Sequence, residues 1–168
     1  MSSGVRPRVW VLNGPNLNLL GTREPHLYGT ATLGEIERAL IESGAHLGAE
    51  IRCFQSNEEG ALVTLVHEAR DQADGLVVNF GAYSHTSIAL RDALAAVPLP
   101  AVEVHLTNVH AREPFRHVMM TAGACAGAVV GLGPIGYQLA LQAVLARLAA
   151  LREPPAGELP PAPFLSHG

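Results

Sequence analysis

Short apolar segments alternate along the chain with longer stretches in which apolar residues recur every three or four positions. The short segments are typical of buried β-strands, which are predicted at residues 9–13, 50–54, 75–79, 100–106 and 127–131. The longer stretches are typical of helices with one buried face, which are predicted at residues 33–47, 62–69, 85–96 and 141–148. Strands and helices therefore alternate through most of the sequence.

This alternation predicts an α/β fold in which a parallel sheet is covered by helices on both faces. Because crossovers between parallel strands are right-handed, we expect a flavodoxin-like, doubly wound five-stranded parallel sheet with strand order 2-1-3-4-5. Segment 50–54 alternates polar and apolar residues, which is typical of a strand at a sheet edge. Residues 1–152 are predicted to form a single domain, and the proline-rich residues 153–168 a loose tail.

The composition narrows the class of protein. Of the 168 residues, 48% are hydrophobic and 15% are charged, which suits one buried core and not a disordered chain. The net charge of -4 offers no general attraction for nucleic acid or for an anionic membrane. The N-terminus lacks the apolar core of a secretory signal, and no apolar run is long enough to span a membrane, so a cytoplasmic location is predicted. Cys53 and Cys125 are expected to be reduced core thiols, although a disulfide between them stays open.

Polar residues follow three of the predicted strands, where ligands bind in sheets of this kind. Asn13 and Asn16 follow the first strand, Asn79 ends the third, and His105 lies at the end of the fourth. The sequence therefore predicts a site at this edge of the sheet, although turn formation alone would also account for the asparagines.

Glu103 and His105 are two positions apart, so their side chains share one face of an otherwise apolar strand. Burying either charge alone is unfavourable, whereas a hydrogen-bonded pair is tolerated. A carboxylate beside a histidine fixes its tautomer and supports its protonated form, as a general acid requires. A purely structural ion pair is the alternative.

The connection from Gly14 to Thr32 is long for a compact domain and is typical of a lid or binding loop. It contains Arg23 and Tyr28, close to Gly21 and Gly29, which are candidate hinges. A cation beside a tyrosine favours the phenolate, which is a base. Surface loops also carry arginine and tyrosine without any such role.

Two further patterns indicate anion binding, although each is also typical of a solvated face. His85 and Asp92 are seven apart on the third predicted helix, with His85 near its N-terminus, where free N–H groups attract anions. Arg112 and Arg116 supply positive charge suited to a carboxylate.

Two other patterns bear on cofactor and metal binding. Residues 131–136 match a dinucleotide-binding pattern, but no second strand with an acidic residue follows, so close helix–strand packing is favoured. The histidines show no metal-ligand spacing. A nucleotide- or flavin-binding module and a non-catalytic assembly protein stay as alternatives to an enzyme without cofactors.

Several long motifs together resemble type II 3-dehydroquinate dehydratase, from about Val9 to Ala150. The motifs span residues 12–21, 23–25, 28–29, 55–57, 81–87 and 103–113, and residues 131–137 fit the family's last strand–helix turn. The resemblance implies elimination of water from 3-dehydroquinate to give 3-dehydroshikimate, a shikimate-pathway step, on a flavodoxin-like fold and without metal or cofactor.

The resemblance also implies a mechanism. The residue matching the family's base is Tyr28, assisted by Arg23, and an enolate forms with a water held by Asn16. His105, oriented by Glu103, then protonates the departing hydroxyl. A phenolate and an imidazolium are a suitable base and acid for this chemistry, and an enolate needs electrostatic support that side chains can give.

The substrate-binding positions implied by the resemblance are Asn79, His85, Asp92, Leu106, Thr107 and Arg116, with Leu106 and Thr107 acting through backbone N–H groups. The family assembles as trimers packed into dodecamers, with the residue matching Asp92 reaching a neighbour's site; the apolar run 118–130 agrees with such an assembly. Thr107 replaces the usual serine and Phe80 a common proline, which leaves substrate affinity open.

Overall fold

The computed structural model describes residues 5–152 and contains one five-stranded sheet. Its strands are β1 (Arg8–Asn13), β2 (Glu50–Gln55), β3 (Gly75–Asn79), β4 (Ala101–His105) and β5 (Gly127–Val130). All neighbouring strands pair in parallel, in the order β2-β1-β3-β4-β5. The predicted flavodoxin-like sheet is therefore confirmed. The predicted tail at 153–168 lies outside the described residues.

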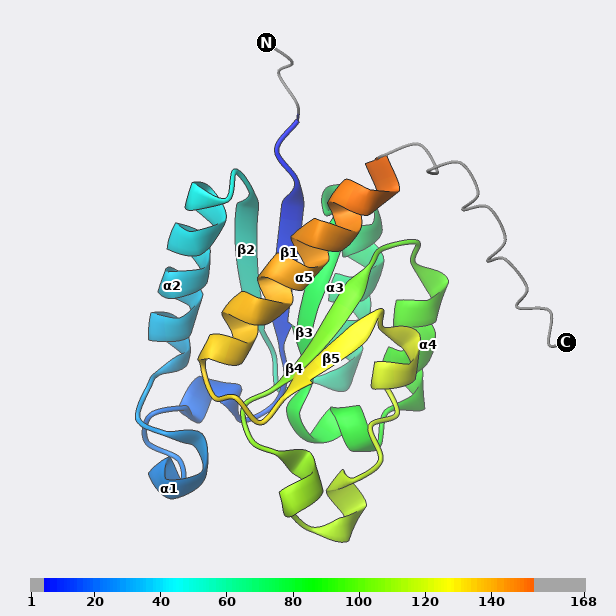
Figure 1. Ribbon diagram of the computed structural model, residues 1–168. Coiled ribbons are helices and arrows are strands. Elements are labelled where there is room, and N and C mark those ends of the chain that lie inside the picture. The colour runs from blue at the N-terminus through cyan, green and yellow to red at the C-terminus, as the bar shows by residue number, and fades with distance from the viewer. Residues whose placement is uncertain (1–4, 153–168) are drawn as a thin grey trace, which may run out of the picture.

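Helices cover both faces of the sheet (Figure 1). They are α1 (Pro25–Tyr28), α2 (Leu33–His46), α3 (Glu59–Gln72), α4 (Ile88–Ala96) and α5 (Ile135–Arg152). The buried faces of α2 and α5 form one apolar core with the sheet, and those of α3 and α4 form a second core on the other face. Because β3 and β4 are buried on both faces, they read as continuous apolar runs broken only by Asn79, Glu103 and His105.

The sheet edges differ from its centre. In β2 the side chains of Glu50 and Arg52 are exposed and Ile51 is buried, which confirms the edge position predicted from alternation. At the other edge, β5 exposes Gly127 and Ala128. The two cysteines are free thiols, and burial raises the pKa of each to about 12.

Two local expectations need correction. The helix predicted from His85 begins only at Ile88, because the Ser87 side chain caps it by accepting from the Leu90 N–H. His85 instead closes a 3₁₀ turn, so it shares no helical face with Asp92 and is not at a helix N-terminus. The connection between β1 and α2 also has internal structure, namely a short 3₁₀ turn and α1, with Leu17 and Leu20 buried.

The far end of that connection is fixed by the start of α2. Thr32 Oγ1 accepts from the Glu35 N–H, and Glu35 Oε2 accepts from the Thr32 N–H at 2.8 Å, which is a complete capping box. Gly21 and Gly29 both adopt positive φ, 91° and 78°. Residues 14–32, called the lid below, are therefore anchored at both ends, with two glycine bends between.

Candidate active site

A pocket opens at the carboxyl ends of β1, β3 and β4. These strand ends lie toward the lower end of the molecule in Figure 1. Nine of the predicted site residues line it: Asn16, Arg23, Tyr28, Asn79, His85, His105, Leu106, Thr107 and Arg116. Glu103 lies fully buried behind His105. Asp92 does not line this pocket; its side chain is 67% exposed and pairs with Arg91 at 3.6 Å.

One wall of the pocket is built on β4. Glu103 and His105 point to the same side of the strand, and Glu103 Oε1 lies 2.6 Å from His105 Nε2. The other carboxylate oxygen, Oε2, accepts from the hydroxyl of Thr121 at 2.6 Å. Glu103 and Thr121 are fully buried and His105 nearly so, hence the histidine ring is held by a carboxylate that solvent does not reach. Sequence reasoning gave Thr121 no role, since nothing in its spacing links it to β4.

The His85 ring stacks on that of His105, with ring centroids 5.7 Å apart. Its Nδ1 lies 2.8 Å from the Val118 carbonyl, which can only accept, so Nδ1 carries a proton. Burial lowers the pKa of His85, and the nearby charges of His105 and Arg116 lower it further. The hydrogen bond to Val118 raises the pKa but does not outweigh these effects. Neutral His85 therefore offers Nε2 as an acceptor.

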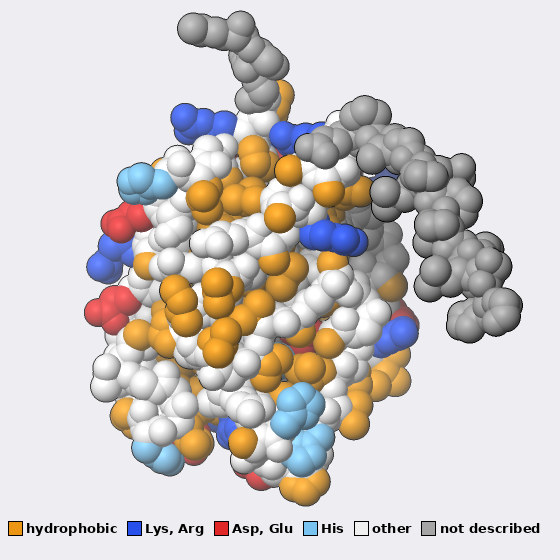
Figure 2. Space-filling view, viewed as in Figure 1, with side chains coloured by type: hydrophobic (Ala, Val, Ile, Leu, Met, Phe, Trp, Pro, Cys, Tyr) orange, Lys and Arg blue, Asp and Glu red, His pale blue; other side chains and the backbone are white. Residues whose placement is uncertain are grey.

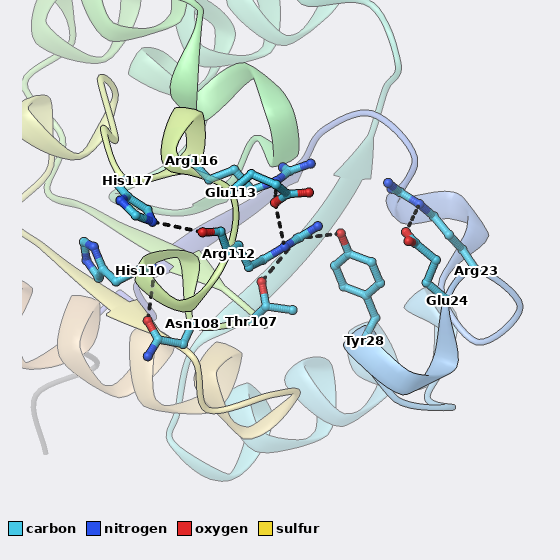
Figure 3. Close-up of polar contacts among 10 residues, drawn as sticks. All are labelled: Arg23, Glu24, Tyr28, Thr107, Asn108, His110, Arg112, Glu113, Arg116 and His117. Carbon is cyan, nitrogen blue, oxygen red and sulfur yellow. Dashed lines mark hydrogen bonds and ion pairs between the residues drawn. The ribbon is translucent and has the colours of Figure 1, made fainter.

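The lid supplies another part of the pocket lining. Arg112 Nη1 donates to the Tyr28 hydroxyl at 2.8 Å, and the Arg23 guanidinium lies 5.2 Å from the centre of the Tyr28 ring (Figure 3). Arg23 also pairs with Glu24 at 3.3 Å. The arginine on the phenol oxygen is thus Arg112, whereas the sequence had indicated only Arg23 as the partner of the tyrosine.

Arg112 and Arg116 surround the same end of the pocket. Glu113 Oε2 lies 2.9 Å from Arg116 Nε and 3.5 Å from Arg112 Nε, so one carboxylate holds both guanidinium groups (Figure 3). Arg112 Nη1 also reaches Thr107 Oγ1, at 3.4 Å. The arginine side chains are only 12% and 18% exposed, so both present positive charge in a partly desolvated place.

The asparagines predicted for the site are held by different means. Asn16 adopts φ 67°, which asparagine tolerates better than most residues, and its N–H donates to Asn57 Oδ1 at 3.0 Å. Asn79 is buried; its Nδ2 donates to the Tyr137 hydroxyl at 2.8 Å and its Oδ1 accepts from the Gly81 N–H at 3.2 Å. Each asparagine is therefore fixed by a contact that its position after a strand did not reveal.

The glycine-rich segment after β5 packs against the end of β4. Gly131 N–H donates to the His105 carbonyl and Gly133 N–H to the Leu106 carbonyl, at 3.0 and 2.9 Å. Gly131 adopts φ 85°, and a Cβ there would lie 2.9 Å from Asn108 Cβ. These contacts support close packing as the reason for the glycines. Within residues 5–152, no group of three or more His, Cys, Asp or Glu side chains could hold a metal ion, and no helix is long and apolar enough to cross a membrane.

Comparison with known proteins identifies the family. The family model for dehydroquinase class II matches residues 7–145. The chain is 60% identical over 141 residues to a 3-dehydroquinate dehydratase of Chelativorans sp., covering 83% of this chain and 97% of the relative. It is 54% identical over 147 residues to catabolic 3-dehydroquinase 2 of Aspergillus flavus, covering 88% and 98%. The crystal structure of type II dehydroquinase from Butyrivibrio crossotus matches with a TM-score of 0.82 at 42% identity, covering 83% of this chain and 98% of that one. The chain therefore belongs to the dehydroquinase class II family, the type II 3-dehydroquinate dehydratases.

Proposed function

We propose that this enzyme converts 3-dehydroquinate to 3-dehydroshikimate and water with Tyr28 as the base and His105 as the acid. The observation that carries the proposal is the content of one pocket, which is lined by Tyr28 on the lid and by a histidine backed by a buried carboxylate. An elimination needs a base and an acid that act on neighbouring carbons of one bound molecule. Two such side chains that line one pocket meet that need.

The base acts first. Tyr28, as phenolate, removes the proton next to the ketone, and the electron pair of that C–H bond forms an enolate. Arg112 supports this step because a guanidinium that donates to the phenol oxygen stabilises the phenolate more than the neutral phenol. Arg23, over the face of the ring, adds a second positive charge close to Tyr28.

The acid completes the elimination. As the enolate collapses, the carbon–oxygen bond of the leaving hydroxyl breaks, and His105 donates the proton that makes it water. Nε2 of His105 is hydrogen-bonded to Glu103, so Nδ1 is the nitrogen left to protonate the hydroxyl. The carboxylate stabilises the imidazolium and keeps the ring in one orientation. The proton gained by Tyr28 and the proton lost by His105 are then exchanged with solvent, which resets both groups.

The remaining pocket groups bind and stabilise. Asn16 is proposed to hold a water near the enolate oxygen, where a hydrogen-bond donor offsets the developing negative charge. The backbone N–H groups of Leu106 and Thr107 are proposed to bind the substrate carboxylate, close to the positive charge of Arg116. Asn79 and His85 contribute the polar contacts for the substrate hydroxyls.

The direct test is to incubate the purified enzyme with 3-dehydroquinate and to follow the conjugated enone of the product by its ultraviolet absorbance. We expect the absorbance to rise with enzyme concentration and to be abolished in His105→Ala. No rise with the wild-type enzyme would overturn the proposed reaction. A rise that His105→Ala leaves unchanged would overturn the assignment of the acid.

We also propose that the protein assembles as a dodecamer built from four trimers, with Asp92 completing a neighbour's site. The exposed position of Asp92 outside its own pocket supports this, as do the exposed apolar side chains of Leu132, Ile135 and Leu139, in or just before the first turns of α5. Figure 2 shows apolar side chains gathered on the face of the molecule that carries α5. Twelve chains of 17.7 kDa would give a mass of about 212 kDa, which light scattering measures.

Mixing two inactive variants tests the contribution of Asp92. If Asp92 acts across an interface, mixtures of Asp92→Ala and Tyr28→Phe subunits contain some sites with neither defect, so activity rises above that of either parent. A fully active monomer would contradict both the assembly and the shared site.

A further inference from the structure

Thr121 lies behind the Glu103–His105 pair, in the connection between β4 and β5. Its hydroxyl oxygen is 2.6 Å from Glu103 Oε2, while Oε1 of the same carboxylate is 2.6 Å from His105 Nε2. Each carboxylate oxygen therefore has one short hydrogen bond, and only one of the two comes from the histidine. We propose that Thr121 is a positioning residue of the reaction, whose hydroxyl holds Glu103 as a carboxylate so that the pair's proton stays on His105. This inference rests on the proposed function of His105 as the acid.

The direction of the hydrogen bond follows from the surroundings. Glu103 and Thr121 are both fully buried, so water does not supply donors to the carboxylate. A buried carboxylate needs donors to stay ionised, and a donor to the charged form favours that form. The Thr121 hydroxyl has a single proton, and Glu103 is its only hydrogen-bond partner among residues 5–152. It therefore donates to Glu103.

Removing this donor would affect the two possible forms of the pair unequally. A buried ion pair is stable only when its other hydrogen-bonding positions are satisfied. Without the hydroxyl, Glu103 Oε2 has no donor, so the neutral form, with the proton on the carboxyl and an uncharged imidazole, gains relative to the ion pair. An uncharged His105 cannot protonate the leaving hydroxyl. The chemical step therefore weakens although every group that touches the substrate is still present.

The segment that carries Thr121 is firmly attached to the same wall. Met120 N–H donates to the Ser84 carbonyl at 2.8 Å, and the Val118 carbonyl accepts from His85 Nδ1 at 2.8 Å. Residues 118–121 thus hydrogen-bond directly to His85 through the Val118 carbonyl, and they are linked to His105 only through Glu103, which Thr121 contacts. Because the segment is fixed at Val118 and Met120, the hydroxyl stays within reach of the carboxylate.

The test is Thr121→Val, which removes the hydroxyl and keeps the shape of the side chain. We expect kcat to fall about tenfold, the size expected for losing a hydrogen bond to a charged group, with KM nearly unchanged. The alkaline limb of the kcat–pH profile should move to higher pH, since losing a donor disfavours the more negative, deprotonated pair. Thr121→Ser should restore kcat and the profile. Thr64→Val, at an exposed hydroxyl on α3, is the matched control and should change neither.

Two further measurements separate this proposal from its alternatives. In a Glu103→Gln background, Thr121→Val should lower kcat little further, because the two residues act through one contact. If the alkaline limb does not move in Thr121→Val, or if Thr121→Ser loses as much kcat as Thr121→Val, Thr121 is only structural and the proposal is overturned.

Should the wild-type enzyme form no enone, the proposed function fails. The proton titration of His105, followed by NMR of ¹³C-labelled histidine in the unliganded protein, then still decides: a shift in Thr121→Val supports the proposal and its absence overturns it.

Discussion

The β4 wall of the pocket and the lid differ in how their side chains are held. On the β4 wall, Glu103 and Thr121 are fully buried, His105 nearly so, and every contact among them is about as short as a hydrogen bond becomes. On the lid, α1 has no buried residue, and the Arg23 and Glu24 side chains are 33% and 44% exposed. The side chain of the proposed acid, His105, is therefore held by contacts within the protein core, whereas the proposed base, Tyr28, depends on a contact from a neighbouring loop.

Because of this difference, substitutions on the two walls should affect stability and activity differently. The contact that holds the Tyr28 hydroxyl comes from Arg112, which lies beyond β4 and 84 positions away along the chain. Changes on the lid should thus reduce activity and leave the fold nearly as stable, while changes on the β4 wall should reduce both. Substitutions on each wall test that separation, beginning with the largest expected effect.

Tyr28→Phe should lower kcat by at least ~10²-fold, the lower end of what a general base contributes. The free energy of unfolding should change little, since Tyr28 is only partly buried. Steady-state kinetics and urea denaturation of the same preparation measure the two effects. A variant that keeps more than about a tenth of the wild-type kcat would exclude Tyr28 as the base.

Glu103→Ala should lower the free energy of unfolding by about 3 kcal/mol, because it leaves the buried partners of the carboxylate unpaired. It should also reduce kcat, so that both quantities fall together. Urea denaturation measures the first, with Glu68→Ala on the exposed face of α3 as the control, for which a change within about 0.5 kcal/mol is expected. Equal stability of the two variants would contradict the idea that the β4 wall is part of the core.

Gly29→Ala tests whether the lid needs its own backbone geometry. Gly29 adopts φ 78° and ψ -173°, a conformation nearly confined to glycine, and a Cβ added there would meet no atom within 4 Å, so strain alone opposes alanine. The strain, about 1–3 kcal/mol, should be relieved by a shift of α1 that moves Tyr28, so kcat/KM falls several-fold with little loss of stability.

Gly48→Ala is the matched control for that strain. Gly48 adopts φ 74° just after α2 and is equally free of neighbours, but it lies in the turn that leads into the amino end of β2, whereas the pocket lies at the carboxyl ends of the strands. Alanine there should lower the melting temperature and leave kcat/KM unchanged. If both variants lost stability and kept activity, the lid would not need the geometry of Gly29.

The contrast between the strand-built β4 wall and the lid also explains which features could be predicted from the sequence. A strand fixes side chains at a period of two, so Glu103 and His105 were correctly placed on one face, and the regular alternation of strands and helices predicted the sheet order. The helix containing Asp92 starts later than its apolar period indicated, because the cap at Ser87 decides where it begins. That cap left His85 in a turn.

Sequence patterns did not predict the contacts that loops make. Arg112 meets Tyr28, and Thr121 meets Glu103, only because loops of particular shape bring them together. The lid residues Arg23 and Tyr28 were found as a pair on a loop, but their separation along the chain does not determine which arginine lies on the phenol oxygen. Such contacts depend on loop conformation, which propensity and periodicity do not specify.

The smallest effect is expected from removing metal ions. This experiment tests whether the side chains of the lid and the β4 wall are sufficient for activity. In the proposed mechanism Tyr28 and His105 supply the proton transfers, and Arg112 and Asn16 supply electrostatic support, so each proposed step is assigned to a side chain. Prolonged treatment with EDTA should therefore leave kcat and KM within experimental error of the untreated enzyme. Activity that EDTA abolishes and a divalent ion restores would show that the two walls need a third component to stabilise the enolate.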